Sequence, residues 1–378
     1  MQQLMFEGVR SLVWREVPEP EMQGPAEALV RPVVAARCDG DVAFLNYDSR
    51  LLKLGTYLHA VDPYFRTRKT NFFQAPFAYG HECVAEVVSV GDAVRDHQKG
   101  DLVVVPWAIS CGHCGRCRAD LTSKCETSAT LLSAYGFGGA AGNFGGVVAD
   151  VLRVPYADAM LVAVPRGVDP LSIASASDNI VDGYRAVAPY LVGTPGAPVL
   201  IVGGGAKSIG LYAAGIAVAL GASRVDYVDY DPACLEAAEA FGAQAVECRG
   251  LERWLRRRSP TLAEGYPITV DASSSVAGLR YALKATAPGG HCTALGFYVW
   301  HGTPLPLWHM YMQSVTLHVG VSHARANIPA ALELVATNKF DPSLLKPLVA
   351  DWADAPLALL ERATKVILRR ARLSVGHE

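Results

Sequence analysis

The sequence predicts an α/β protein with two domains, one rich in β-strands and one built on a parallel sheet. Three observations support this fold class. Up to about residue 165, apolar residues come in short runs broken by Gly, Pro and Asp, which is typical of strands joined by turns. After Pro170, strand-like runs alternate with helix-like segments, which indicates a parallel sheet with helices on both faces. Four cysteines within residues 111–125 indicate a metal-bound lobe in the first domain.

Length and composition are those of a globular enzyme. The 378 residues are enough for two domains, and 51% are hydrophobic and 19% charged. The net charge of −2 gives no electrostatic case for nucleic acid or an anionic membrane as a partner. Nine cysteines without a recognisable signal peptide lead us to expect a reducing, cytoplasmic setting. The apolar run 199–222 contains Lys207 and several glycines, so we expect a buried strand and helix there and no membrane span.

The first domain is expected to comprise residues 1–170, joined by the tail, 323–378. Its strand candidates are the apolar runs 28–36, 83–91, 101–106 and 144–154. The second domain is expected over residues 171–322 and begins with a mostly helical segment, 171–188. Its expected strands are 199–202, 225–229, 268–271 and 291–295, and its expected helices are 208–220, 232–241 and 276–287.

The cysteines follow the spacing C-x2-C-x2-C-x7-C. They are Cys111, Cys114, Cys117 and Cys125. Four thiolates at these intervals can close a tetrahedron around one zinc ion. Unrelated buried thiols, a disulfide knot and an iron–sulfur cluster are the alternatives. A four-point spacing with no obvious open position favours a closed structural zinc.

A glycine-rich turn lies between the strand 199–202 and the helix that follows it. Such a turn presents backbone N–H groups and a positive helix end to a pyrophosphate, and an acid at the end of the next strand can bind the ribose hydroxyls. The expected cofactor-binding residues here are Gly203, Gly205, Lys207, Ser208, Gly210 and Asp229. Asp229 favours NAD, because a carboxylate repels a 2′-phosphate. Either Gly205 opens the motif and Lys207 fills the second glycine position, or Gly203 opens a longer loop in which Lys207 pairs with the pyrophosphate.

The cysteine lobe followed by this βα unit resembles the zinc-dependent medium-chain dehydrogenases, the alcohol dehydrogenase superfamily, over nearly the whole chain. The resemblance implies a GroES-like catalytic domain, a Rossmann domain, a structural and a catalytic zinc, NAD and a small-molecule substrate. It also implies a homo-oligomer, either a dimer or a tetramer.

By this resemblance, the catalytic zinc takes a Cys from a C-G-[ST]-D segment and a His from G-H-E. Here these are Cys38, in Cys-Asp-Gly-Asp, and His81, in Gly-His-Glu. The third ligand precedes a helical Gly by five residues, which selects Asp178, with Asp182 as the rival. The pair Ser177-Asp178 has some resemblance to the formaldehyde dehydrogenase branch. Taken alone, each ligand has an ordinary structural explanation as a buried thiol, a core histidine or a helix cap.

The resemblance assigns three more roles. Asp41 would orient the imidazole of His81, Glu82 would lie beside the metal, and Lys365 would lie close to Glu82 and to the cofactor phosphates.

Two departures from the family pattern bear on function. Gly40 replaces the Ser or Thr that passes the alcohol proton outward, so the proton leaves through water or another group, or the reaction is not simple alcohol oxidation. Cys38 and His81 are 43 residues apart, about twice the spacing we expect. The extra segment, 48–71, is either a solvated insertion or subunit contact, or a pocket wall for an anionic substrate.

The leading functional hypothesis is a zinc-dependent oxidoreductase that transfers a hydride between NAD(H) and an alcohol, polyol or aldehyde. One alternative is a dismutase or redox-neutral enzyme with tightly bound NAD. The other is a catalytically silent, zinc-stabilised oligomeric protein that retained the fold.

Overall fold

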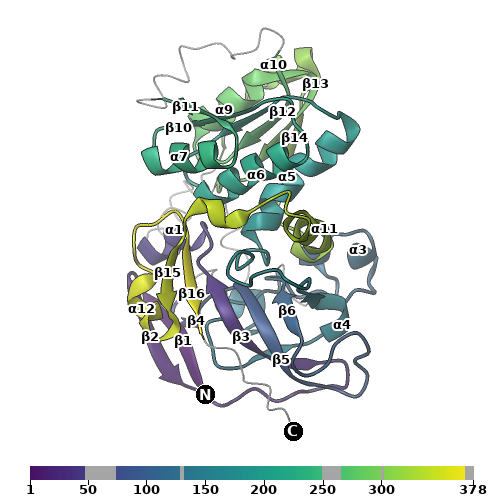
Figure 1. Ribbon diagram of the computed structural model, residues 1–378, viewed down its shortest axis with the longest axis vertical. Helices are drawn as coiled ribbons and strands as arrows, with labels where there is room; N and C mark the ends of the chain where they lie inside the picture. Colours follow the sequence, from purple (N-terminus) through teal and green to yellow (C-terminus); the bar gives the residue numbers. More distant parts are fainter. Residues whose placement is uncertain (47–73, 128–131, 249–264, 299–301, 371–378) are drawn as a thin grey trace. The chain divides into compact units, whose positions relative to one another are not determined.

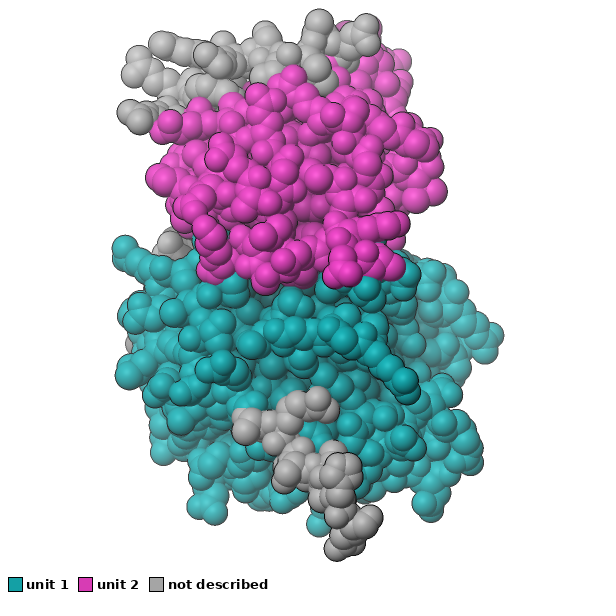
Figure 2. Space-filling view, viewed as in Figure 1, with its two compact units in different colours: residues 1–181, 323–336, 347–378 teal, residues 182–322, 337–346 magenta. Residues whose placement is uncertain are grey.

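The computed structural model describes residues 1–46, 74–127, 132–248, 265–298 and 302–370 (Figure 1). The segment 48–71 lies outside these residues. The chain divides into two compact units, coloured separately in Figure 2. Unit 1 consists of Met1–Val181, His323–Ala336 and Pro347–Glu378, and unit 2 of Asp182–Ser322 and Thr337–Lys346. The domain ranges expected from the sequence stay a prediction.

Unit 1 is built on two sheets. Its larger sheet has the order β15-β16-β3-β5-β6-β8, with β7 also paired to β3, and all pairs are antiparallel except β15 with β16. These strands are β3 (Ala28–Ala36), β5 (Glu82–Val90), β6 (Leu102–Val105), β7 (Leu152–Val154), β8 (Val162–Ala163), β15 (Leu348–Asp351) and β16 (Val366–Arg369). The smaller sheet has the order β2-β1-β4, from β1 (Gln2–Gly8), β2 (Ser11–Glu16) and β4 (Phe77–Ala78).

The helices of unit 1 are mostly short. They are α1 (Asp41–Asn46), α3 (Gly115–Arg118), α4 (Ala157–Met160), α11 (Ala324–Ala336), α12 (Ala355–Ala358), and the 3-10 turns η2 (Thr122–Lys124), η3 (Gly138–Ala141) and η5 (Trp352–Asp354). Phe6, Phe44 and Phe77 pack edge to face or tilted in the core, with ring centroids 5.0–5.7 Å apart. These aromatic contacts join α1 to the smaller sheet, so they hold the segment that follows β3 in place.

Unit 2 is built on one parallel sheet with the order β11-β10-β9-β12-β13-β14. Its strands are β9 (Val199–Val202), β10 (Val225–Asp229), β11 (Gln244–Glu247), β12 (Tyr266–Asp271), β13 (Thr286–Ala294) and β14 (Thr316–Val319). Its helices are α5 (Asn179–Gly193, which begins in unit 1), α6 (Lys207–Ala219), α7 (Pro232–Ala240), α9 (Val276–Ala285), α10 (Leu307–Gln313) and the turn η4 (Pro342–Leu345). In Figure 1, α6 and α7 lie on one face of the sheet and α9 and α10 on the other. The strand order reverses at β9, which is where open α/β sheets of this order bind ligands.

Two glycines allow helix α6 to approach its neighbours closely, one on the side of the sheet and one on the side of helix α5. A Cβ on Gly210 would lie 2.9 Å from the Cβ of Ala272, which follows β12. A Cβ on Gly183, in α5, would lie 2.8 Å from the backbone nitrogen of Ala213. Residues with side chains would push these elements apart.

The apolar run that raised the question of a membrane span forms β9 and α6. Among the residues that the structure describes, no helix combines the length and the apolar character that crossing a membrane requires.

Candidate metal and nucleotide sites

Two strands of unit 1 bring Cys38 and His81 together. Strand β3 ends at Ala36, which pairs with Glu82 at the start of β5. Cys38 lies two residues beyond β3 and His81 directly before β5, so both side chains come from the same end of this strand pair. Both residues are buried, with 6% and 2% of their surface exposed.

Asp178 completes a cluster of three potential ligands. Its Oδ2 accepts a hydrogen bond from Cys38 Sγ at 3.3 Å and lies 3.5 Å from His81 Nε2. One ligand atom from each of Cys38, His81 and Asp178 lies within 4.8 Å of the other two. The segment is held against β5, because Ser177 Oγ donates to the carbonyl oxygen of Cys83 and accepts from its N–H. The structure therefore unites the three residues that the sequence placed at a catalytic metal.

The rival carboxylate, Asp182, has a different partner. It forms an ion pair with Arg185, one turn further along α5, and it is not part of the three-ligand cluster. Arg185 also donates to the carbonyl oxygen of Gly320. Between the two aspartates, the geometry supports Asp178.

Asp41 lies behind the histidine, on the side away from Asp178. Its Oδ1 is 3.7 Å from His81 Nδ1, and its Oδ2 accepts from the Tyr79 hydroxyl at 2.9 Å and from the backbone N–H of Cys38 at 3.3 Å. Burial opposes a charge on His81, but the carboxylates of Asp41 and Asp178 outweigh it and raise the pKa of His81 to about 9. Asp41 is therefore placed to orient the ring from outside the ligand set.

Glu82 and Lys365 form a buried ion pair next to this cluster. Lys365 Nζ donates to Glu82 Oε2 at 2.7 Å, and neither side chain has exposed surface. Glu82 Oε1 accepts from the backbone N–H of Asn179 at 2.9 Å. Burial raises the pKa of Glu82, and the charge of Lys365 opposes that rise. Lys365 is thus seen paired with Glu82, whereas its expected place near the cofactor phosphates stays a prediction.

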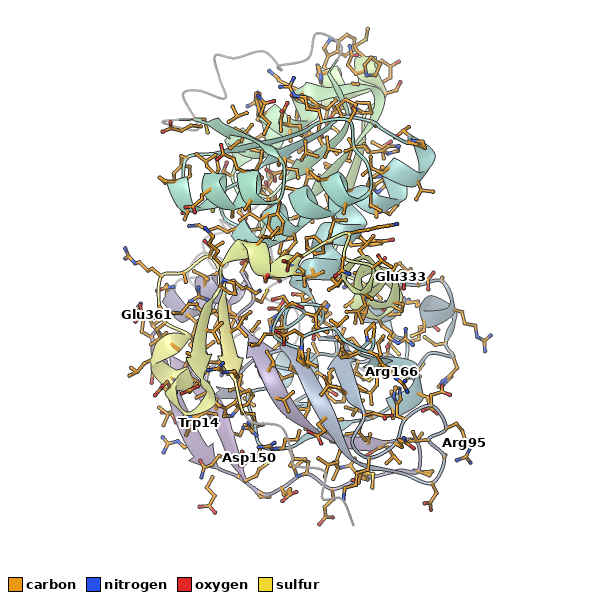
Figure 3. All side chains as sticks on the ribbon, in the orientation of Figure 1. Trp14, Arg95, Asp150, Arg166, Glu333 and Glu361 are labelled. Carbon is orange, nitrogen blue, oxygen red and sulfur yellow. The ribbon has the colours of Figure 1, made fainter. Side chains whose placement is uncertain are left out.

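The segment that carries Lys365 is fixed by Arg37. The guanidinium donates to the carbonyl oxygens of Leu359, Glu361 and Ala363 at 2.7–2.8 Å. Glu361 is labelled in Figure 3. Because Arg37 precedes Cys38, one short stretch anchors this C-terminal segment and supplies a potential ligand.

The donor set of the cluster fits a divalent cation. Burial raises the pKa of the Cys38 thiol well above its usual value, and the carboxylates of Asp178, Asp41 and Glu82 raise it further. A thiolate in such surroundings requires a nearby positive charge, which a metal ion supplies. The backbone N–H of Gly40 already donates to Cys38 Sγ at 3.3 Å. Thiolate, imidazole and carboxylate are ligands that zinc accepts.

The sequence did not reveal three other residues around the cluster. Phe137 stacks on His81 with ring centroids 4.8 Å apart, and Trp107 lies edge-on to His81 at 6.4 Å. Asn179 Oδ1 accepts from Cys38 Sγ at 3.1 Å. Asn179 was detectable in principle as the neighbour of Asp178. The two aromatic residues belong to no metal-binding motif, so the sequence carried no sign of their position.

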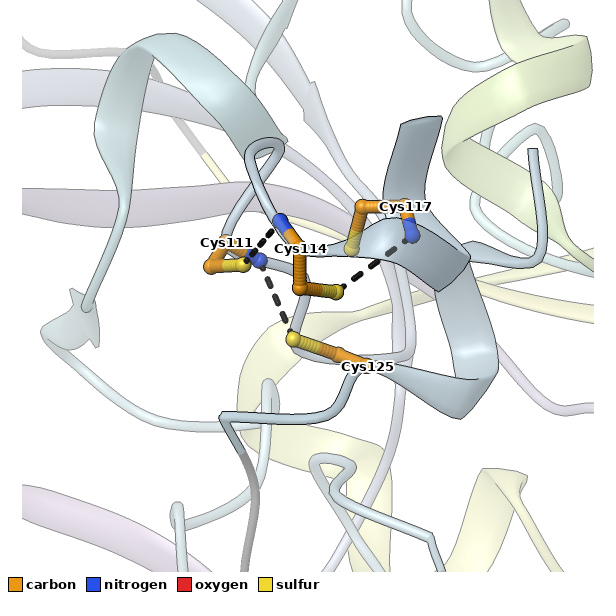
Figure 4. A group of neighbouring side chains, drawn as sticks. All are labelled: Cys111, Cys114, Cys117 and Cys125. Carbon is orange, nitrogen blue, oxygen red and sulfur yellow. Dashed lines mark hydrogen bonds between the residues drawn. The ribbon is translucent and has the colours of Figure 1, made fainter. Parts of the chain in front are cut away.

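The four cysteines form a separate cluster in unit 1. Figure 4 shows their sulfur atoms turned toward one another, and these atoms lie within 4.8 Å of each other. All four are free thiols, as are the other cysteines of the described chain. Backbone N–H groups donate to three of the sulfurs at 3.4–3.5 Å. Two of these donors, on Glu126 and Cys117, lower the pKa of Cys114 to about 6.

This cluster fits a closed zinc site. A zinc–sulfur distance of about 2.3 Å in a tetrahedron requires sulfurs roughly 3.8 Å apart. Gly112 has φ +78 and turns the chain between the first two cysteines, where a Cβ would lie 2.8 Å from the Cβ of Ala159. Four sulfurs fill a tetrahedron and leave no position for a substrate.

The glycine-rich turn of unit 2 connects β9 to α6. Gly203 follows β9 directly, and a Cβ there would lie 2.3 Å from Asp229 Oδ2. Asp229 accepts from the backbone N–H groups of Tyr230 and Asp231 at 2.6 and 3.0 Å, and from the Tyr227 hydroxyl at 3.1 Å. The contact between Gly203 and Asp229 supports Gly203 as the opening glycine.

The first turn of α6 follows at once. Lys207 is the first residue of α6, and its ammonium pairs with Asp231. Ser208 is buried beside it, and Gly210 packs against Ala272. Which glycine opens the motif stays a prediction, and Lys207 has a carboxylate partner within the chain.

Comparisons with known proteins agree with this geometry. Residues 24–166 match the alcohol dehydrogenase GroES-like domain, and residues 208–337 match the zinc-binding dehydrogenase family. A probable zinc-binding alcohol dehydrogenase of Mycobacterium tuberculosis is 28% identical over 90% of this chain and 80% of its own length. An L-threonine 3-dehydrogenase of Chelativorans sp. is 30% identical over 75% of this chain and 73% of its own length.

The formaldehyde dehydrogenase branch also matches in part. A glutathione-independent formaldehyde dehydrogenase of Pseudomonas aeruginosa is 37% identical over 44% of this chain and 43% of its own length. Among solved structures, an alcohol dehydrogenase from Thermus sp. ATN1 superposes with a TM-score of 0.80 at 29% identity, covering 98% of this chain and 99% of that one.

The fold and the two thiol-containing clusters define a zinc-type oxidoreductase with a GroES-like and a Rossmann domain. The chain belongs to the zinc-dependent medium-chain dehydrogenases, the alcohol dehydrogenase superfamily.

Proposed function

We propose that this protein transfers a hydride between NAD(H) and an alcohol, a polyol or an aldehyde at a zinc ion held by Cys38, His81 and Asp178. The observation that carries the proposal is the convergence of two buried side chains and the partly buried Asp178 in a chain of the zinc-binding dehydrogenase family. No observation favours the dismutase-like or the catalytically silent alternative over this function.

The bound zinc would act as a Lewis acid on the substrate oxygen, and the nicotinamide would exchange the hydride. The chain's own residues prepare this site. Three protein ligands leave the fourth position of a tetrahedral ion open to substrate. Asp41 Oδ1 faces His81 Nδ1 at 3.7 Å and favours the orientation of its ring, and the Gly40 N–H stabilises charge on Cys38 Sγ. One carboxylate in place of a second thiolate donates less charge, which makes the ion a stronger Lewis acid.

The nucleotide is NAD, bound at the turn 203–210. The backbone N–H groups and the N-terminus of α6 receive the pyrophosphate. The carboxylate of Asp229, at the carboxyl end of β10 and against Gly203, accepts the ribose hydroxyls. The four-cysteine lobe holds a second zinc with a structural role.

The test compares two aspartates that are four residues apart. Asp178→Ala removes a ligand, and Asp182→Ala, the matched control, removes a carboxylate that pairs with Arg185. We expect two zinc ions per chain in the wild type and in Asp182→Ala, and one in Asp178→Ala, by elemental analysis. NAD binding should persist in all three proteins.

Turnover is followed by nicotinamide absorbance across alcohols, polyols and aldehydes. Turnover by Asp178→Ala should be about a thousandfold lower than that of the wild type, or lower still. If Asp182→Ala loses the metal and Asp178→Ala keeps it, the ligand assignment is wrong. If both variants keep full activity, the zinc mechanism is wrong. The homo-oligomeric state expected from the sequence stays a prediction.

A further inference from the structure

Lys207 is the one charged residue within the glycine-rich turn and the first turn of α6, residues 203–210. A lysine at this position faces the region where a dinucleotide's phosphates bind, so its charge matters for which phosphates are accepted. In the structure its ammonium pairs with Asp231, and the two side chains are 37% and 25% exposed. The pair is therefore partly withdrawn from water and is not a fully solvated surface contact.

Asp231 is fixed in place by a second role. It is the N-cap of α7, where its Oδ1 accepts from the backbone N–H of Ala233 at 3.0 Å, while its Oδ2 accepts from Lys207. The Lys207 ammonium and the cap lower the pKa of Asp231. Asp231 raises the pKa of Lys207 against the effect of burial. Both groups are charged at neutral pH, and a helix cap anchors the anion.

The pair lies beside the acid that we assign to the ribose. Asp231 follows Asp229 by two residues, and its backbone N–H donates to Asp229 Oδ1. The negative charge of Asp229 also acts on Lys207. Among the residues that the structure describes at this corner, Asp229, Asp231 and Lys207 together carry a net charge of −1, and the ammonium pairs with Asp231 and not with the acid that we assign to the ribose.

We propose that Asp231 is a specificity-determining residue, which keeps the Lys207 ammonium paired with a carboxylate and so excludes dinucleotides that carry a 2′-phosphate. This inference rests on the proposed NAD binding at the turn. A 2′-phosphate would meet Asp229 and Asp231 and would find no unpaired ammonium in the turn. Without the charge of Asp231, Lys207 is released to pair with that phosphate.

The experiment uses Asp231→Asn in the full-length protein. Asn caps a helix as well as Asp does, so α7 is preserved while the charge is lost. The matched control is Glu236→Gln, which removes a carboxylate from the same helix and breaks its 2.7 Å contact with Lys346. Dissociation constants for NADH and NADPH are measured by fluorescence titration of wild type, both variants, and the double variant Asp231→Asn with Lys207→Met.

We expect Asp231→Asn to tighten NADPH binding about tenfold relative to NADH, and Glu236→Gln to leave the ratio unchanged. The double variant should lose this gain, because the gain depends on Lys207. Raising the salt concentration should reduce the gain in NADPH affinity of Asp231→Asn, because salt screens the charge of Lys207.

If NADH and NADPH both bind more tightly by the same factor, Lys207 moves to the pyrophosphate that they share. This result would overturn the inference and leave the proposed function standing. An unchanged ratio of NADPH to NADH affinity in Asp231→Asn would also overturn the inference and leave the proposed function standing. A gain in that ratio that persists when Lys207→Met is added would do the same. If the wild type binds neither nucleotide, the proposed nucleotide site fails first and the inference fails with it.

Discussion

The ammonium of Lys365 lies 2.7 Å from Glu82 Oε2, with both side chains fully buried. Removing one partner of such a pair leaves an uncompensated charge away from water. We expect Lys365→Met to lower the free energy of unfolding by about 3–5 kcal/mol in urea titrations. The double variant Lys365→Met with Glu82→Gln should recover part of that loss, since no buried charge then remains. A double variant less stable than the sum of the two single changes would contradict this account.

Arg37→Lys should loosen the segment 359–365. A lysine cannot reproduce the fork that reaches three carbonyl oxygens, so we expect a loss of about 1–3 kcal/mol and faster hydrogen exchange in that segment. Arg369→Lys is the control, because Arg369 is 58% exposed and lies 3.6 Å from Asp351. Similar losses of unfolding free energy in Arg37→Lys and Arg369→Lys would show that the three hydrogen bonds of Arg37 do not hold this segment.

Cys114→Ser should remove the structural zinc. Elemental analysis should find one zinc ion fewer per chain, and the free energy of unfolding should fall by at least about 3 kcal/mol, because metal binding there is coupled to folding. NAD affinity should change little. Cys234→Ser, at a buried thiol outside the cluster, is the control and should keep both ions. A stable Cys114→Ser protein with its full zinc content would refute the assignment.

Asp271 should make stability depend on pH. Burial raises its pKa from 3.8 to about 6, although the hydroxyls of Ser273 and Tyr298 donate to it and oppose the rise. Between these two pKa values the folded protein keeps a proton on Asp271 that the unfolded chain releases. Protonated Asp271 therefore stabilises the folded state at low pH, and this stabilisation is lost as pH rises. The loss is about 3 kcal/mol at most.

Asp271→Asn does not titrate and provides the comparison. The stability of the wild type minus that of the variant should fall as pH rises from about 4 to about 6.5, in urea titrations at each pH. A difference that is constant over this range would show that Asp271 titrates normally.

Much of the fold could be predicted from the sequence because burial produces clear periodicity. The strands at 28–36, 199–202 and 225–229 have the expected bounds. The prediction was less accurate where polar side chains bond to neighbouring segments. In 171–188, helix α5 begins only at Asn179, since Ser177 pairs with Cys83 and holds the preceding residues as turns. In 144–154 only Leu152–Val154 form a strand.

The candidate site shows the same limit. Cys38, His81 and Asp178 follow spacings that a sequence displays, and the structure brings them together. Phe137 and Trp107 reach the same place by tertiary packing, which no local pattern encodes. The spacing selected Asp178 over Asp182, and the structure places Asp178 in the three-residue cluster while Asp182 pairs with Arg185.

Unit 1 is assembled from three separate stretches of chain, and Glu82 and its cation Lys365 come from the first and the last of them. On the ribosome, the first stretch emerges long before residue 365. Until then Glu82 lacks the ammonium of Lys365, and a buried carboxylate without that charge is costly unless it stays hydrated or protonated. The ion pair beside the three-residue cluster is therefore completed late in synthesis, long after Cys38, His81 and Asp178 have been made.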